Sequence, residues 1–151
     1  MDEESITAFI VKAKKNTYAT NGGKSVPRIP GSREHRFRYE EYEYTDIYFG
    51  ELSFNGIETV FHKGKPIWGM VYSGAVLDEE SSVEAIYAFL KKCLSMIDEE
   101  APFRGPKSYE EDEYAYYNDF SGDIYHFIGY EHIDSDQGTL YELHYSGGEI
   151  G

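Results

Sequence analysis

The sequence predicts an α+β fold, in which two helices pack against one antiparallel sheet of about six strands. Apolar residues recur at helical spacing in two segments, and aromatic and β-branched residues alternate with charges elsewhere. The predicted order is a helix and three strands, followed by a second helix and three strands. Two parts of the chain also share letters, which suggests a pseudo-twofold duplication of half-repeats at roughly residues 1–76 and 77–151. A chain of 151 residues suits a single domain, here 1–151.

Both predicted helices are amphipathic. The first spans Glu3–Lys15, with acids in its first turn and lysines in its last, as the helix dipole favours. The second begins at Ser81 or Ser82, where Ser81 and Glu84 fit a capping box, and it ends before Pro102. Its broad apolar face consists of Val83, Ile86, Phe89, Leu90, Cys93, Leu94 and Ile97.

The predicted strands form two groups of three. A Gly- and Pro-rich loop over residues 21–31 leads to two strands within Phe37–Phe61, punctuated by Gly50 and by Asn55-Gly56, and to a third from Pro66 to Tyr72. The acidic run Tyr109–Glu113 is interpreted as a solvated loop. The second group follows it, with turns at Ser121-Gly122 and 135–138, and comprises Tyr114–Phe120, Asp123–Ile133 and Thr139–Tyr145.

The suspected repeat is short but regular. The segment FNGIETV at Phe54–Val60 aligns with FIGYEHI at Phe127–Ile133, sharing Phe, Gly and Glu. In both copies a Tyr-Ser-Gly ending follows, 18 residues after the phenylalanine, at Tyr72 and at Tyr145. If the repeat is a duplication, a pseudo-twofold axis relates the halves.

The charge excludes several classes of partner. The chain has 28 acidic and 14 basic residues, a net charge of −14, which opposes direct binding to nucleic acid or to an anionic membrane. The segment 1–38 holds eight basic and four acidic residues, a net of +4, so the remainder carries −18. This basic arm either packs on the acidic body or is reserved for a partner.

The compartment is predicted from what the chain contains. Cys93 is the single cysteine, so no intramolecular disulfide can form, and the start MDEES is unlike a signal peptide. No apolar run approaches the ~18 residues of a membrane-spanning helix. We therefore expect a soluble, cytoplasmic protein.

Two glutamates are the main candidates for a site. Glu58 and Glu131 each lie between apolar neighbours on one strand face, two residues from a glycine. A carboxylate in such a place pairs with a cation or has a raised pKa. One alternative is an internal ion pair to Arg104, Lys107 or the basic arm, or an exposed sheet edge. The other is an acidic ligand-binding cleft that includes Arg104 and has as its aromatic walls Trp68, Tyr72, Tyr141 and Tyr145.

No motif in the sequence indicates a cofactor or metal. The five histidines lack a zinc-binding spacing, and no phosphate-binding glycine loop or nucleophile elbow is present. An enzyme with Glu58 or Glu131 as general base stays open, but nothing supplies a nucleophile.

The sequence resembles a bacterial family of domains of unknown function. The resemblance rests on Asn21-Gly22-Gly23, Phe54-Asn55-Gly56-Ile57-Glu58, Gly64-Lys65-Pro66-Ile67-Trp68, Tyr72-Ser73-Gly74 and Arg104-Gly105-Pro106. Such domains often follow an Xre-type helix-turn-helix in transcriptional regulators, which implies a sensory or partner-binding role. The duplicated order is also similar to GyrI-like effector-binding domains, whose cleft binds cationic drugs with a glutamate and aromatics.

Two functions from different classes are therefore expected. The first is a stand-alone ligand-sensing domain for a small molecule, cationic or aromatic. The alternative is an acidic protein-interaction module or nucleic-acid mimic that inhibits a DNA-binding protein. A homodimer is compatible with either function.

Overall fold

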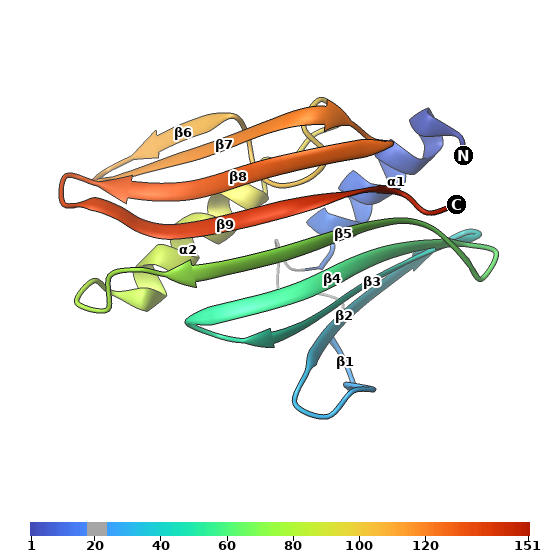
Figure 1. Cartoon of the computed structure of the whole chain (residues 1–151), viewed down its shortest axis with the longest axis horizontal. Coiled ribbons are helices and arrows are strands. Elements are labelled where there is room, and N and C mark those ends of the chain that lie inside the picture. The colour runs from blue at the N-terminus through green and yellow to red at the C-terminus, as the bar shows by residue number, and fades with distance from the viewer. Residues whose placement is uncertain (18–23) are drawn as a thin grey trace.

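The computed structural model describes residues 1–17 and 24–151, except for the side chain of Ser25. Its strands form a single antiparallel sheet of nine in the order β1-β2-β3-β4-β5-β9-β8-β7-β6 (Figure 1). The predicted six-strand sheet is therefore wrong, and the fold is dominated by strands. The strands are β1 (Lys24–Ser25), β2 (Arg33–Tyr39), β3 (Tyr42–Gly50), β4 (Ser53–His62), β5 (Lys65–Val76), β6 (Ser108–Glu111), β7 (Tyr114–Asp123), β8 (His126–Ser135) and β9 (Gly138–Glu149).

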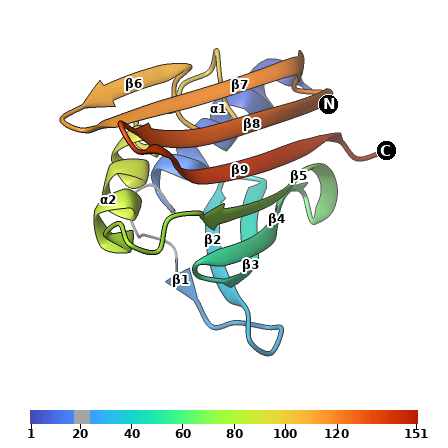
Figure 2. The same ribbon diagram turned by 60° about the vertical axis from the view of Figure 1, so that its left-hand side comes forward.

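The helices α1 (Glu3–Lys15) and α2 (Val83–Leu94) lie on the same face of the sheet (Figures 1 and 2). The first helix has the predicted bounds, and the side chain of its N-cap Asp2 accepts a hydrogen bond from the Ser5 amide. In α2 the cap is Ser82, whose side chain accepts from the Ala85 amide, so the capping box predicted at Ser81 is wrong.

Two of the strands that the sequence failed to predict, β2 and β6, end in turns without glycine. Strands β2 and β3 are joined at Glu40, and β6 and β7 at Asp112, both with positive φ near 55°. Glutamate seldom adopts this conformation, so the sequence gives no turn signal at Glu40, whereas Asp112 is of a type that tolerates it but lies within a run of acids. The acidic run at 109–113 is consequently a strand and a hairpin turn, and β1 lies in the predicted loop at 21–31, whose residues 21–23 lie outside the described ones.

Three glycines interpreted as turn residues belong to strands instead. Gly50 is the last residue of β3 and Gly122 the last but one of β7, with φ of +94° and +95°, and a Cβ on either would lie 2.1 Å from a backbone oxygen. Asn55-Gly56 lies within β4, because Gly56 pairs with Tyr48 on one side and Tyr72 on the other. The actual turns follow Gly50 and Gly122 by one residue or two.

The two halves of the chain meet at the centre of the sheet. Strand β5 pairs with β9, and in this seam Tyr72 lies directly opposite Tyr145. Strands β4 and β8, which carry the similar segments, flank the seam on either side. The strand order outward from the seam is therefore the same in both halves, apart from the extra two-residue β1.

The core lies between the helices and the sheet face that they cover. Its aromatic rings come from both halves: Trp68 stacks on Phe127 at 5.7 Å, and Phe127 stacks on Phe103 at 3.8 Å between ring centroids. The buried Trp68 indole N–H donates to the Ile124 carbonyl at 3.0 Å, so its polar atom is satisfied.

Among the described residues, neither helix is long and apolar enough to cross a membrane.

Candidate functional site

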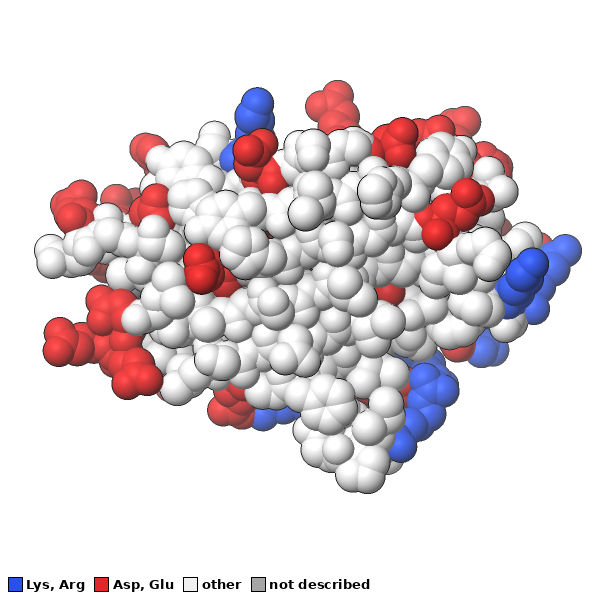
Figure 3. All heavy atoms as spheres, in the orientation of Figure 1, with Lys and Arg blue, Asp and Glu red and all other residues white. Residues whose placement is uncertain are grey.

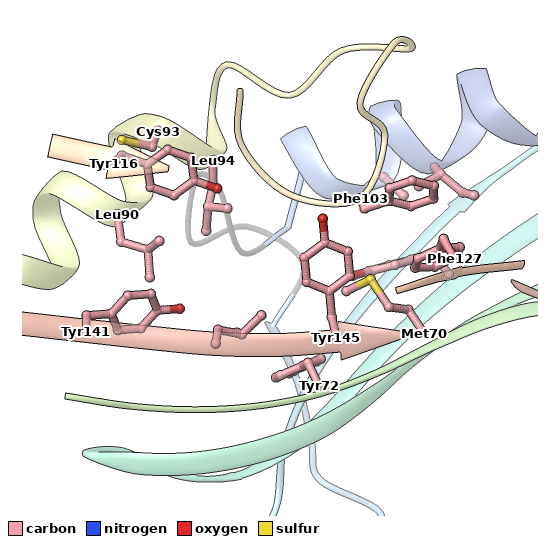
Figure 4. Close-up of a cluster of buried hydrophobic side chains, with 14 of the residues drawn as sticks. Met70, Tyr72, Leu90, Cys93, Leu94, Phe103, Tyr116, Phe127, Tyr141 and Tyr145 are labelled. Atoms are coloured by element: carbon pink, nitrogen blue, oxygen red, sulfur yellow. The ribbon is translucent and has the colours of Figure 1, made fainter. Parts of the chain in front are cut away.

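The residues predicted to form a site lie on the sheet face that the helices cover. Glu58 comes from β4, Glu131 from β8, and the aromatic residues from β5 and β9, while Arg104 follows α2. Figure 4 shows Tyr141 and Tyr145 rising from β9 toward the helix and toward Phe103. All seven side chains are buried: Glu58, Trp68, Tyr72, Arg104, Glu131, Tyr141 and Tyr145.

Glu131 is the centre of a saturated hydrogen-bond network. Arg104 donates to both carboxylate oxygens, from Nε to Oε2 at 3.0 Å and from Nη2 to Oε1 at 2.8 Å. The hydroxyl of Tyr141 donates to Oε1 at 2.8 Å, and that of Tyr116 donates to Oε2. Burial, followed by the charge of Glu131, raises the pKa of both tyrosines well above its ordinary value. The bidentate ion pair between Arg104 and Glu131 holds the arginine side chain in one orientation.

Glu58 pairs with a cation from the N-terminal helix. The Lys14 Nζ lies 2.9 Å from Glu58 Oε1, and both side chains are fully buried. Lys14 also donates to the Phe103 carbonyl, so α1 is tied to the segment that follows α2. Burial lowers the pKa of Lys14, and the Glu58 carboxylate opposes that shift.

Both glutamates thus form internal ion pairs, which is the first of the two alternatives that the sequence left open. Lys14 belongs to the basic arm, and Arg33 and Arg38 of that arm pair with Glu51 and Glu43. The arm therefore packs on its own body at these places. A ligand-binding role for Glu58 or Glu131 stays a prediction, since each is already engaged by a cation.

Asp46 is a third buried carboxyl group, and the sequence analysis did not select it. It lies on β3 directly opposite Glu58, and the Tyr72 hydroxyl donates to its Oδ1 at 2.7 Å. Among the described residues it forms no ion pair. Burial, and next the neighbouring charge of Glu58, raise the pKa of Asp46 to about 8. Its alternation with Tyr44 and Tyr48 is the signal that could have found it.

The matching place in the other half holds an amide. Asn118, on β7 opposite Glu131, accepts from the Tyr145 hydroxyl at 2.7 Å and donates to the Gly105 carbonyl at 3.0 Å. Gly105 in turn donates its N–H to the Tyr116 hydroxyl at 2.9 Å. The backbone of Gly105, in the segment after α2, therefore satisfies the polar groups of Asn118 and Tyr116 with neutral hydrogen-bond partners.

The glycines beside the glutamates make room for tyrosine rings. A Cβ at Gly56 would lie 2.4 Å from the Tyr72 hydroxyl oxygen, and one at Gly129 would lie 2.0 Å from Tyr145 Cζ. The room that each of these glycines leaves, two residues from a glutamate, is thus filled by the aromatic side chain of the neighbouring strand.

A cavity of about 720 Å³ lies beside Asp46, between α2 and strands β1 to β5. Two of the predicted site residues, Tyr72 and Arg104, contribute to its wall, whereas Glu58, Glu131, Trp68, Tyr141 and Tyr145 are not among the described lining residues. The aromatic and apolar wall is formed by Tyr48, Phe54, Tyr72, Tyr87, Leu90 and Leu94. Charged and polar groups at the same cavity come from Lys24, Arg33, His35, Asp46, Glu51, Glu84, Lys91 and Arg104.

The comparisons with known proteins give a family. Neither the curated proteins nor the solved structures contain a match to this chain. A family model described as "Domain of unknown function (DUF5680)" matches residues 46–150, which begin at the buried Asp46 and include both Glu58 and Glu131. Because the match covers more than half of the chain, this protein belongs to the DUF5680 family.

Proposed function

We propose that this protein is a ligand-sensing domain whose cavity binds a small aromatic amine, with Asp46 as the anionic partner. The observation that carries the proposal is a difference among three buried carboxyl groups on the sheet face that the helices cover. Glu58 pairs with Lys14 and Glu131 with Arg104, whereas Asp46 forms no ion pair among the described residues and feels these two cations only at longer range. A cationic ligand would supply the missing charge.

The cavity has the composition that such a ligand requires. Its volume of about 720 Å³ lies within the range of small-molecule sites. Tyr48, Phe54 and Tyr87 offer ring faces to an aromatic or cationic group. Arg104 and Arg33 also line the cavity, but each is paired with a glutamate, Glu131 and Glu51. Lys24 and Lys91 line the cavity as well, and their charges weaken the attraction of Asp46 for a cation.

Ligand binding is expected to change the protonation of Asp46. The raised pKa of about 8 keeps this carboxyl mostly protonated at neutral pH. An amine that is already protonated favours the carboxylate, so its binding releases a proton from Asp46. Binding should therefore tighten as the pH rises toward and through about 8, as long as the amine stays protonated.

The sequence resemblance adds a setting to this chemistry. Because similar domains often follow Xre-type helix-turn-helix segments, and GyrI-like domains bind cationic drugs, we place the sensing role in bacterial gene regulation in the cytoplasm. The acidic side chains in Figure 3 lie mostly around the outline of the sheet face. They do not form a continuous stripe on that face, which is what nucleic-acid mimicry would need.

The test compares charged and neutral ligands of one shape. Thermal denaturation is measured with phenethylamine, tryptamine and benzamidine, and with their uncharged counterparts phenylethanol, indole-ethanol and benzamide. We expect the amines to raise the melting temperature and the neutral compounds to leave it nearly unchanged. Calorimetric titration in two buffers of different ionisation enthalpy should show proton release with wild type.

Two variants make the test specific. Asp46→Asn keeps an acceptor for the Tyr72 hydroxyl and should abolish both the melting-temperature shift and the proton release. Glu43→Gln removes an acid from β3 outside the cavity and should bind like wild type. The proposal is wrong if no amine shifts the melting temperature, or if Asp46→Asn retains the shift.

A further inference from the structure

The sheet face that the helices leave uncovered is unusual for so acidic a chain. Alternation along the strands identifies three central outward positions on each of five strands. They are Thr45, Ile47 and Phe49 of β3; Asn55, Ile57 and Thr59 of β4; Gly69, Val71 and Ser73 of β5; His144, Ser146 and Gly148 of β9; and His126, Ile128 and Tyr130 of β8. None of these fifteen, which we call the outer patch, is Asp, Glu, Lys or Arg.

Thr45 and Gly148, at one end of the patch, are buried, and the other thirteen positions are exposed or half-buried. Charged residues make up 28% of the chain, so about four of thirteen surface positions would carry a charge if charges were evenly spread. Figure 3 views the molecule from this side, and the middle of the face is largely white while Asp and Glu gather toward its outline. Apolar side chains replace them: Ile57, Val71 and Ile128 are 46%, 50% and 64% exposed. Large exposed apolar surfaces of this kind mark interaction sites.

The outer patch contains both a projection and a hollow. A groove of about 390 Å³ runs along the β5–β9 seam, with Val71, Ser73, His144 and Ser146 among its lining residues. Ile128 stands at one border of this groove, and Ile57 pairs with Val71 on the other side of β5. A knob beside a hollow on one surface is the arrangement that a twofold contact between identical copies requires.

We propose that the outer patch is the interface of a homodimer, in which the sheets of two copies pack face to face. Five strands about 4.8 Å apart give a patch roughly 24 Å wide and 20 Å long. This footprint of roughly 480 Å² is smaller than the ~800 Å² that each partner buries in a standard interface, so we expect a weak dimer that dissociates on dilution. In the dimer, Ile128 of each copy enters the groove of the other, and the shared core resembles that of a β-sandwich.

The charge distribution favours a second copy of this chain, rather than a basic protein, as the partner that covers the outer patch. Each copy carries −14, so two copies repel one another except where carboxylates are absent, which is the outer patch. An interface for a basic partner would instead be expected to contain Asp and Glu side chains, and the outer patch contains none. Salt screens the repulsion between acidic rims, so a homodimer should tighten as ionic strength rises, whereas a complex with a basic partner should weaken.

The oligomeric state in solution tests the proposal. Sedimentation equilibrium of the full chain is measured over a wide concentration range at about 0.05 M and about 0.5 M NaCl. We expect a dimer that dissociates on dilution, with a dissociation constant at least tenfold lower at the higher salt. Ile128→Glu and Val71→Glu should each give a monomer at concentrations where the wild type is dimeric.

Leu77→Glu is the matched control, because Leu77 is also apolar and 48% exposed but follows β5 outside the patch. It should remain dimeric, and circular dichroism should show that all three variants keep the fold. A wild type that stays monomeric at every concentration and both salts overturns the proposal. So does a dimer that persists in both Ile128→Glu and Val71→Glu.

Discussion

Asp46 and Asn118 occupy matching places in the two halves of the sheet, and each accepts a hydrogen bond of 2.7 Å from the tyrosine of a central strand. The amide of Asn118 also donates to a backbone carbonyl, so its two polar atoms are both satisfied. Asp46 also accepts from a tyrosine hydroxyl, but it is an acid and forms no ion pair among the described residues. It is therefore either protonated or a buried carboxylate without a paired cation. The half of the sheet that contains Asp46 borders the cavity, whereas in the other half Asn118 is tied to the segment after α2.

Asp46→Asn should therefore change the pH dependence of stability. The folded-state pKa of Asp46 is raised from 3.8 to about 8, so between these values the native state holds a proton that the unfolded state releases. The free energy of unfolding consequently falls as the pH rises through this window. Asn cannot ionise, so the variant should lose that part of the decline. Urea denaturation of both proteins from about pH 4 to about pH 9 checks the difference, and parallel curves would contradict the assigned pKa.

The reverse change, Asn118→Asp, should destabilise the protein at neutral pH. It removes the amide donor to the Gly105 carbonyl and sets a carboxyl near Glu131 in a buried position. Leaving a buried acceptor unsatisfied costs ~1–3 kcal/mol, and a buried charge adds to this. The loss should shrink at acid pH, where the new carboxyl is protonated. A stability equal to wild type at neutral pH would show that Gly105 has another donor.

The buried ion pairs should respond asymmetrically to single and double substitution. Lys14→Met leaves Glu58 buried without its cation, which is expected to cost about 3–5 kcal/mol. Adding Glu58→Gln removes the orphaned charge and should recover much of that loss. Chemical denaturation of both single variants and the double variant completes the cycle. Additive losses would mean that the 2.9 Å contact contributes no coupling.

Gly129→Ala should destabilise the protein through a clash with Tyr145. The added Cβ would lie 2.0 Å from Tyr145 Cζ, closer than any real contact, so the ring or the strand must move. Overpacking of this kind costs roughly 1–3 kcal/mol. Combining the change with Tyr145→Leu should give a loss smaller than the sum of the two single losses. Thermal denaturation of the two single variants and the double variant provides the comparison.

Cys93 should be chemically inert in the folded protein. Its side chain is fully buried on α2, and burial raises the pKa of its thiol to about 12. Because the thiolate is the reactive form, a thiol reagent should modify it only as fast as the protein opens. The rate of reaction with Ellman's reagent should therefore rise in urea in parallel with unfolding. A fast reaction in buffer would show a local opening of α2.

Much of the arrangement around the seam was predictable from local patterns. The spacing of Ile6, Phe9 and Ile10 gave the first helix its bounds, and the repeated Phe, Gly and Glu identified the two strands that flank the centre. The turn at Glu40 was not predictable, because glutamate seldom adopts a positive φ. Aspartate does tolerate this conformation, but Asp112 lies in an acidic run that was interpreted as a solvated loop. As a result β2 and β6 were missed, as was the two-residue β1, and the number of strands was wrong.

The cavity carboxyl was missed for a different reason. Glu58 and Glu131 stand out because the repeat contains them, whereas Asp46 matches an asparagine, so similarity between the halves hides it. Its raised pKa depends on burial and on the charge of Glu58, and it is lowered only in part by Lys14 and Arg104, which pair with the two glutamates. Those are contacts between segments distant in sequence, which a local pattern does not contain.

The pairing of β5 with β9 has a consequence for synthesis of the chain on the ribosome. Residues 77–137 separate the two strands, so at roughly 5–20 residues per second β5 waits about 3–12 s for its neighbour. During this interval the hydrogen-bonding edge of β5 is open, and Lys14 and Glu58 can already meet while Arg104 and Glu131 are still being made. An open edge beside Val71 is a template for pairing with other nascent chains. The emergence of β9 is thus the step at which this protein either completes its own sheet or aggregates.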